Sequence, residues 1–207
     1  MMLAYKAWRE SRTRFLLSAA ALLWFCSLFV LVRHGVRASA ERPYADFVAG
    51  SIYGGGIRTL YTIFVVLLGL GGLVPERAYG SAGFTLALPV HRMRLVVVRA
   101  AAGLAQVAAL ALAPALVVLA LSGLVNETYP AREALLRSAQ WAAAGADAFA
   151  LALLASVLWE TFAALAASLA ATCVYAALLG APTPLIASAA VAVMVALAAW
   201  LTERQDF

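Results

Sequence analysis

Long apolar runs alternate with short polar segments along the whole chain. Six of these runs approach the length of about 20 residues that a helix needs to cross a bilayer. They cover residues 15–32, 60–74, 95–123, 140–158, 162–180 and 184–201. The second run is short, so we expect its helix to begin a turn or two earlier. The pattern predicts an all-α polytopic membrane protein with six transmembrane helices in a single domain, residues 1–207.

The composition excludes a water-soluble fold. Of the 207 residues, 65% are hydrophobic and 12% are charged, whereas soluble domains are about half apolar and a quarter charged. A core built by a chain of this length is too small to bury that excess. The same hydrophobicity excludes a disordered chain, and two cysteines are too few for a disulfide scaffold.

The N-terminal residues 2–14 combine aromatic and basic side chains. Tyr5 and Trp8 follow a helical spacing, and the basic residues among them are Lys6, Arg9, Arg12 and Arg14. This pattern is typical of a helix that lies in the membrane interface. The alternative is a plain basic flank that only orients the first span, and the sequence leaves both open.

The distribution of basic residues predicts the orientation. With a cytoplasmic N-terminus, nine of the 15 Lys and Arg residues fall in cytoplasmic segments and six fall outside. Basic loops stay cytoplasmic, so we expect both termini in the cytoplasm and the chain in the cell inner membrane. The net charge of +5 then reflects topology and lipid contact, and no nucleic-acid partner is expected.

Intramembrane ionisable groups are costly and therefore mark candidate sites. Asp147 is the one such candidate, in the fourth span. It either lines a polar cavity or a proton path, or lies in water near the outer interface, and the cost of an unpaired acid in lipid favours water. His34 and His91 have no neighbouring Cys or carboxylate at ligand spacing, so no metal site is expected. Motifs of common hydrolases and nucleotide-binding proteins are also lacking, which argues against catalysis by this chain.

The segment 75–94, between the second and third spans, has the most specific sequence. It reads PERAYGSAGFTLALPVHRMR. A solvated basic loop that only sets topology gains nothing from exposing Phe84, Leu86 and Leu88. An amphipathic segment that docks into another protein does, so we expect a cytoplasmic coupling helix here.

This segment resembles the signature of ABC transporter permeases of the type-2 exporter class. Glu76 and Arg77 match the acidic-basic opening, and Gly80-Ser81 matches a Gly-Thr or Gly-Ser step. The apolar run that includes Phe84 ends on Leu86, Leu88 and Pro89, and Arg92 matches an Arg three residues beyond that Pro. His91 departs from the Ser or Thr common at its position.

The resemblance implies a half-transporter. A second permease copy, identical or different, would complete the pore. Separate cytoplasmic ABC ATPase subunits would bind ATP and Mg²⁺, so the chain itself would hold no cofactor. ATPase closure would act on residues 75–94 and drive alternating access. The scarcity of polar groups in the spans favours an amphipathic or hydrophobic substrate. The alternative function is a non-transporting membrane scaffold or immunity-type protein.

Overall fold

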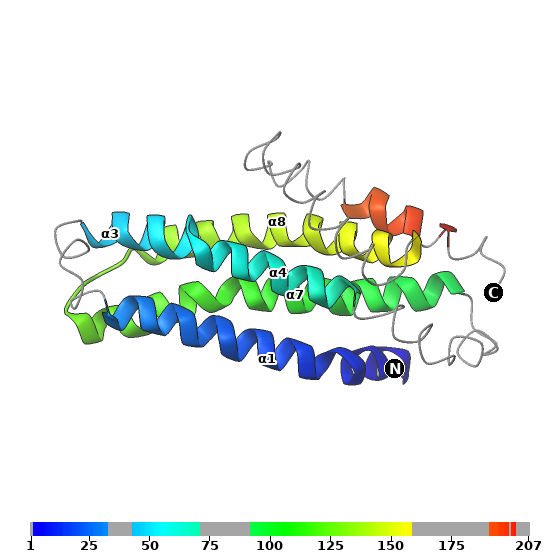
Figure 1. Cartoon of the computed structure of the whole chain (residues 1–207), viewed down its shortest axis with the longest axis horizontal. Helices are drawn as coiled ribbons and strands as arrows, with labels where there is room; N and C mark the ends of the chain where they lie inside the picture. The colour runs from blue at the N-terminus through cyan, green and yellow to red at the C-terminus, as the bar shows by residue number, and fades with distance from the viewer. Residues whose placement is uncertain (1, 33–42, 71–91, 159–190, 199, 202–207) are drawn as a thin grey trace.

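The structure is a computed structural model that describes residues 2–32, 43–70, 92–158, 191–198 and 200–201. Its elements, labelled as in Figure 1, are α1 (Met2–Val32), α3 (Tyr44–Phe47), the π-helix η2 (Val48–Tyr53), α4 (Gly56–Leu70), α7 (Arg92–Ser122), the 3₁₀-helix η3 (Gly123–Val125) and α8 (Ala131–Leu158). Residues 191–198 and 200–201 are also helical. These described residues contain no strand, which agrees with the all-α prediction.

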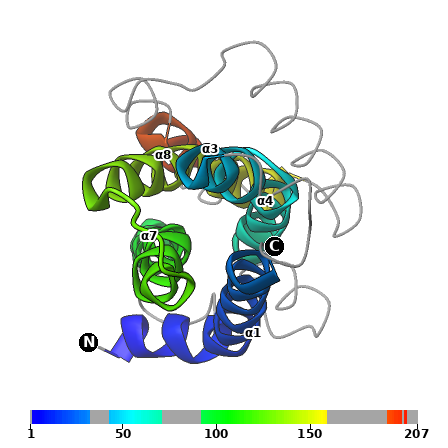
Figure 2. The ribbon, with the colours of Figure 1, turned by 90° about the vertical axis from the view of Figure 1, so that its left-hand side faces the viewer.

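Four helical stretches are long and apolar enough to cross a membrane. They are Ala7–Val32, Tyr44–Leu70, Arg94–Val125 and Ala131–Val157. They run in alternating directions along the long axis of the molecule (Figure 1). The predicted fifth span, 162–180, lies outside the described residues. Residues 75–91 of the predicted coupling helix lie outside them as well. Only the second half of the sixth is described, and it lies beside α8 in both Figure 1 and Figure 2.

The third predicted span, 95–123, lies within three residues of the ends of the apolar helical stretch Arg94–Val125. Pro114 lies inside α7 and does not end it. The first predicted span, 15–32, lies within α1, which is continuous from Met2. Its N-terminal part runs across the end of the bundle before the helix follows the long axis (Figure 2).

The second span was expected to begin a turn or two before residue 60, and α4 begins one turn before it, at Gly56. Gly54 and Gly55 form a bend ahead of α4, and the apolar helical stretch continues back beyond this bend to Tyr44. Buried side chains precede the bend at helical spacing. Tyr44, Phe47, Val48, Ile52 and Tyr53 are all buried. Of these buried residues, Val48, Ile52 and Tyr53 belong to the π-helix η2.

Helix α8 begins before the fourth predicted span, 140–158. It starts at Ala131, directly after Pro130, which is a residue that favours helix starts. The backbone N–H of Ala134 donates to the Pro130 carbonyl at 3.1 Å. Arg132 and Glu133, which precede the predicted span, are both exposed on the first turn of the helix.

The core lies between α7, α8, α4 and one face of α1, where Leu22, Cys26 and Val30 are fully buried. Its centre is aliphatic, with Val65, Leu110, Val118 and Leu153 almost completely buried. In contrast, α1 exposes Leu17 and Trp24, as expected for a helix that faces lipid.

Glycines allow the closest helix approaches. A Cβ added at Gly69 of α4 would lie 2.7 Å from Ala152 Cβ and 2.9 Å from the Phe149 carbonyl oxygen, both on α8. Gly103 of α7 faces the ring of Phe149 in the same way. Small residues at such positions let helix backbones pack closely in membranes, so α8 is held tightly between α4 and α7.

We predict that Gly69→Ala destabilises the bundle. The added methyl group meets backbone on α8, which cannot move aside cheaply, and overpacking of this kind costs about 1–3 kcal/mol. Thermal unfolding in lipid nanodiscs measures the effect. Gly50→Ala is the matched control, because Gly50 is exposed in η2 with nothing within 4 Å of the added Cβ. Equal melting temperatures for the two variants would contradict the prediction.

Candidate functional site

The predicted coupling residues lie almost entirely outside the described part of the chain. These are Glu76, Arg77, Gly80, Ser81, Phe84, Leu86, Leu88 and Pro89, whereas Arg92 is the first residue of α7. The flanks of the segment are described. The end of α4 at Leu70 and the start of α7 at Arg92 lie toward the same end of the bundle as the N-terminus (Figure 1). The described residues that flank the segment on both sides thus lie toward that end.

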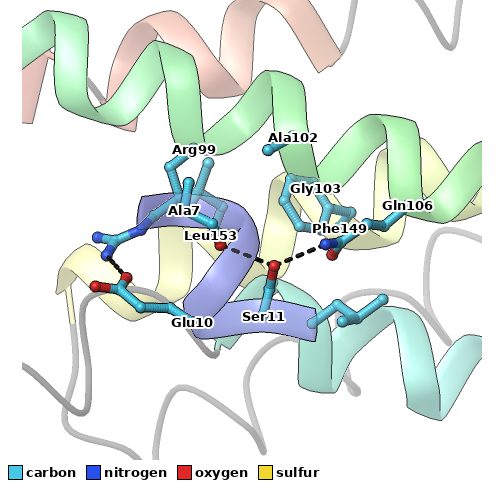
Figure 3. A pocket seen from close by; sticks show the side chains of 11 residues that line it. Ala7, Glu10, Ser11, Arg99, Ala102, Gly103, Gln106, Phe149 and Leu153 are labelled. Atoms are coloured by element: carbon cyan, nitrogen blue, oxygen red, sulfur yellow. Dashed lines mark hydrogen bonds and ion pairs between the residues drawn. The ribbon is translucent and has the colours of Figure 1, made fainter. Parts of the chain in front are cut away.

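An ion pair connects the N-terminal part of α1 to α7 at this end. Arg99 Nη2 donates to Glu10 Oε2 at 2.8 Å (Figure 3). The side chains are 19% and 35% exposed, respectively. An Arg near the start of a membrane span is costly without a partner, and Glu10 supplies a carboxylate from a segment 89 positions away.

A separate pair of hydrogen bonds lies beside the ion pair. Gln106 Nε2 donates to Ser11 Oγ at 2.7 Å, and the Ser11 hydroxyl donates to the Ala7 carbonyl oxygen at 2.9 Å. Because the Ser11 proton is already committed, the Gln106 amide must present its nitrogen to Ser11. We call Glu10, Ser11, Arg99 and Gln106 the polar joint.

The polar joint borders a small cavity between four helices. The lining comes from α1, the end of α4, α7 and α8, and includes Gly69, Gly103 and Phe149 (Figure 3). Gln106 is 3% exposed, and within the described part of the chain its Oε1 accepts no hydrogen bond. A buried acceptor left in this state costs about 1–3 kcal/mol.

The polar joint was not predicted from the sequence, although part of it follows a helical spacing. Arg99, Gly103 and Gln106 are spaced by four and three positions, which places them on one face of α7. In the sequence, Arg99 contributes only to the count of basic residues that predicts the orientation of the chain in the membrane. Its pairing with Glu10 depends on where α1 crosses the bundle, which periodicity does not show.

Aromatic residues connect α4 to α8 in the opposite half of the bundle. The Tyr61 hydroxyl donates to the Trp141 carbonyl oxygen at 3.0 Å, and Trp141 Nε1 donates to the Tyr53 carbonyl oxygen at 3.3 Å. The rings of Tyr61 and Trp141 are stacked with centroids 4.8 Å apart. Every one of these groups is used in holding helices together, so we assign this aromatic cluster a structural role.

Tyr129 extends the aromatic contacts into the connection before α8. Its ring meets that of Tyr44 edge to face, with centroids 6.3 Å apart. Burial raises the pKa of the Tyr129 phenol above its ordinary value, and the Arg137 guanidinium opposes this shift. The phenol is therefore neutral at physiological pH.

The favoured placement of Asp147 in water near the outer interface is wrong. Its side chain is 1% exposed. The reason is the early start of α8 at Ala131, which places Asp147 about four turns into the helix. It lies about 200° around α8 from Gly145, which contacts Tyr61 and Val107. Asp147 thus faces away from α4 and α7, and its role in a polar cavity or proton path stays a prediction.

Metal ligation finds no support in the described ranges, where no three His, Cys, Asp or Glu side chains come together. Comparisons with known proteins add no identification: no protein-family model, no curated protein and no solved structure matches the chain.

We predict that Glu10 and Arg99 are energetically coupled. Each is partly exposed, so the coupling should be about 1 kcal/mol, at the upper end for exposed ion pairs. A double-mutant cycle with Glu10→Gln and Arg99→Met, read out as unfolding free energies in nanodiscs, measures it. In the control cycle, Arg94→Met replaces Arg99→Met, because Arg94 is exposed on the same helix. Additive effects within about 0.3 kcal/mol in both cycles would refute the coupling.

Proposed function

We propose that this chain is the transmembrane subunit of an ATP-driven ABC exporter in the cell inner membrane, with both termini cytoplasmic. The observation that carries the proposal is the segment 75–94. It has an acidic-basic opening, an apolar middle and a Leu-Pro close before Arg92, and it lies between the second and third spans. A second permease copy completes the pore, and separate ATPase subunits bind ATP and Mg²⁺.

The fold supports this orientation. The end of the bundle from which the segment departs also carries the N-terminal part of α1 (Figure 1). Arg9, Arg12, Arg14 and Arg94 are exposed at that end. Exposed basic residues beside the spans favour the cytoplasmic side, where an ATPase would dock.

The helix packing supports a mechanism in which force passes through the segment. A push on residues 75–94 reaches the end of α4 and the start of α7 directly, because both helices adjoin the segment in sequence. Gly69 allows α4 to pack closely against α8, and Gly103 allows α7 to pack closely against the same helix. We therefore expect these three helices to move as a nearly rigid body during alternating access.

The interior of the described bundle favours an amphipathic or hydrophobic substrate. Its buried polar residues are few, namely Ser18, Gln106, Ser122, Ser138, Asp147 and Ser156. A sugar or an ion needs several convergent polar groups, and the aliphatic centre between α4, α7 and α8 does not provide them. Shape and apolar contact would then select the substrate.

We predict that Glu76→Ala and Leu86→Asp uncouple transport from ATP hydrolysis. A charge introduced into an apolar docking contact costs more than the 1.4 kcal/mol of a tenfold affinity change, so Leu86→Asp should weaken ATPase binding at least about tenfold. Substrate-stimulated ATPase activity of the reconstituted complex and the affinity of the two subunits measure the effects.

Matched controls lie at the opposite end of the bundle. Leu124→Asp, at an exposed position, and Glu127→Ala, at a half-buried one, make the same changes after α7, and both should retain coupling. Absence of any copurifying ATPase, together with normal behaviour of Glu76→Ala and Leu86→Asp, would reject the proposal. That outcome would favour the non-transporting scaffold or immunity-type protein.

A further inference from the structure

The cavity at the polar joint contains a buried acceptor that the described protein groups do not satisfy. Gln106 lines the cavity and is 3% exposed, and its Oε1 accepts no hydrogen bond within the described ranges. Its amide nitrogen is held by Ser11 at 2.7 Å. The carbonyl end is thereby fixed in orientation and available to a donor in the cavity.

The size of the cavity decides which ligand fits. Its volume is about 30 Å³. Roughly 10–15 Å³ of such space holds one water. A lipid headgroup, a nucleotide or an amphipathic substrate is far too large, so the only common cellular ligand of this size that donates hydrogen bonds is water.

The lining supplies enough polar partners for a bound water. A buried water makes two to four hydrogen bonds. Gln106 Oε1 offers an acceptor, and Ser11, Glu10 and Arg99 add polar groups around the same cavity. Glu10 and Arg99 are also partly exposed, so the cavity has a polar edge through which water can enter.

The geometry points to an internal hydration site at the polar joint: one or two waters bind between Gln106 Oε1 and the Ser11, Glu10 and Arg99 side chains. The contact between the N-terminal part of α1 and α7 is then a wet polar contact beside an aliphatic core. This inference is independent of the transport proposal, because it holds for any function of the bundle.

Water-to-amide magnetisation transfer tests the site directly. The chain contains three glutamines, Gln106, Gln140 and Gln205, so side-chain ¹⁵N-Gln labelling of the full chain in nanodiscs gives a spectrum of three amides. Gln106→Leu assigns the Gln106 signal by its loss. We expect a rotating-frame Overhauser cross-peak between water and the Gln106 amide, with the sign that excludes chemical exchange. No cross-peak at the Gln106 amide would overturn the proposal.

Two variants distinguish bound water from its alternatives. Ala102→Leu adds volume to the cavity lining and should abolish the cross-peak, whereas Ala105→Leu on the exposed side of α7 should retain it. A cross-peak that is unchanged in Ala102→Leu would show that the signal does not come from water in this cavity, and would overturn the proposal.

Discussion

A helix in the hydrocarbon of a bilayer must satisfy its polar groups within itself or against a neighbouring helix. The described part of this chain meets the constraint by separating its interhelical contacts by type. Polar side chains meet at the polar joint, aromatic side chains pack against backbone carbonyls in the opposite half, and aliphatic side chains and glycines fill the space between. Polar groups thereby connect particular helices, and Asp147 of α8 is the only charged side chain among the buried residues that the structure describes.

The position of the polar joint links packing to the proposed function. Arg99 and Gln106 belong to α7, which begins directly after the segment 75–91, and their partners Glu10 and Ser11 belong to the N-terminal part of α1. Any displacement of the start of α7 must therefore carry α1 with it or break these contacts. A docking protein that acts on the segment would consequently move more of the bundle than the two helices it adjoins.

The sequence predicted the helical class and the third span because α7 is a continuous apolar run with charges only near its start. Gly54 and Gly55 do form a bend, but the helices on both sides of it make one apolar stretch from Tyr44 to Leu70. The sequence placed the start of the fourth helix too late, because Arg132 and Glu133 are typical of loops but lie here on an exposed helical turn. The same error displaced Asp147 toward water. The pairing of residues within the polar joint could not be predicted from the sequence, because it joins residues about 90 positions apart and depends on the course of α1.

The central proposal is that the segment 75–94 meets an ATPase. Site-specific photo-crosslinking in native membranes tests it most directly, with p-benzoylphenylalanine placed at position 86 in one protein and at position 124, in η3 at the opposite end, in another. The account predicts a crosslink from position 86 to a protein that carries a nucleotide-binding P-loop, and none from position 124. A protein that crosslinks equally at both positions, or no ATPase at position 86, would contradict it.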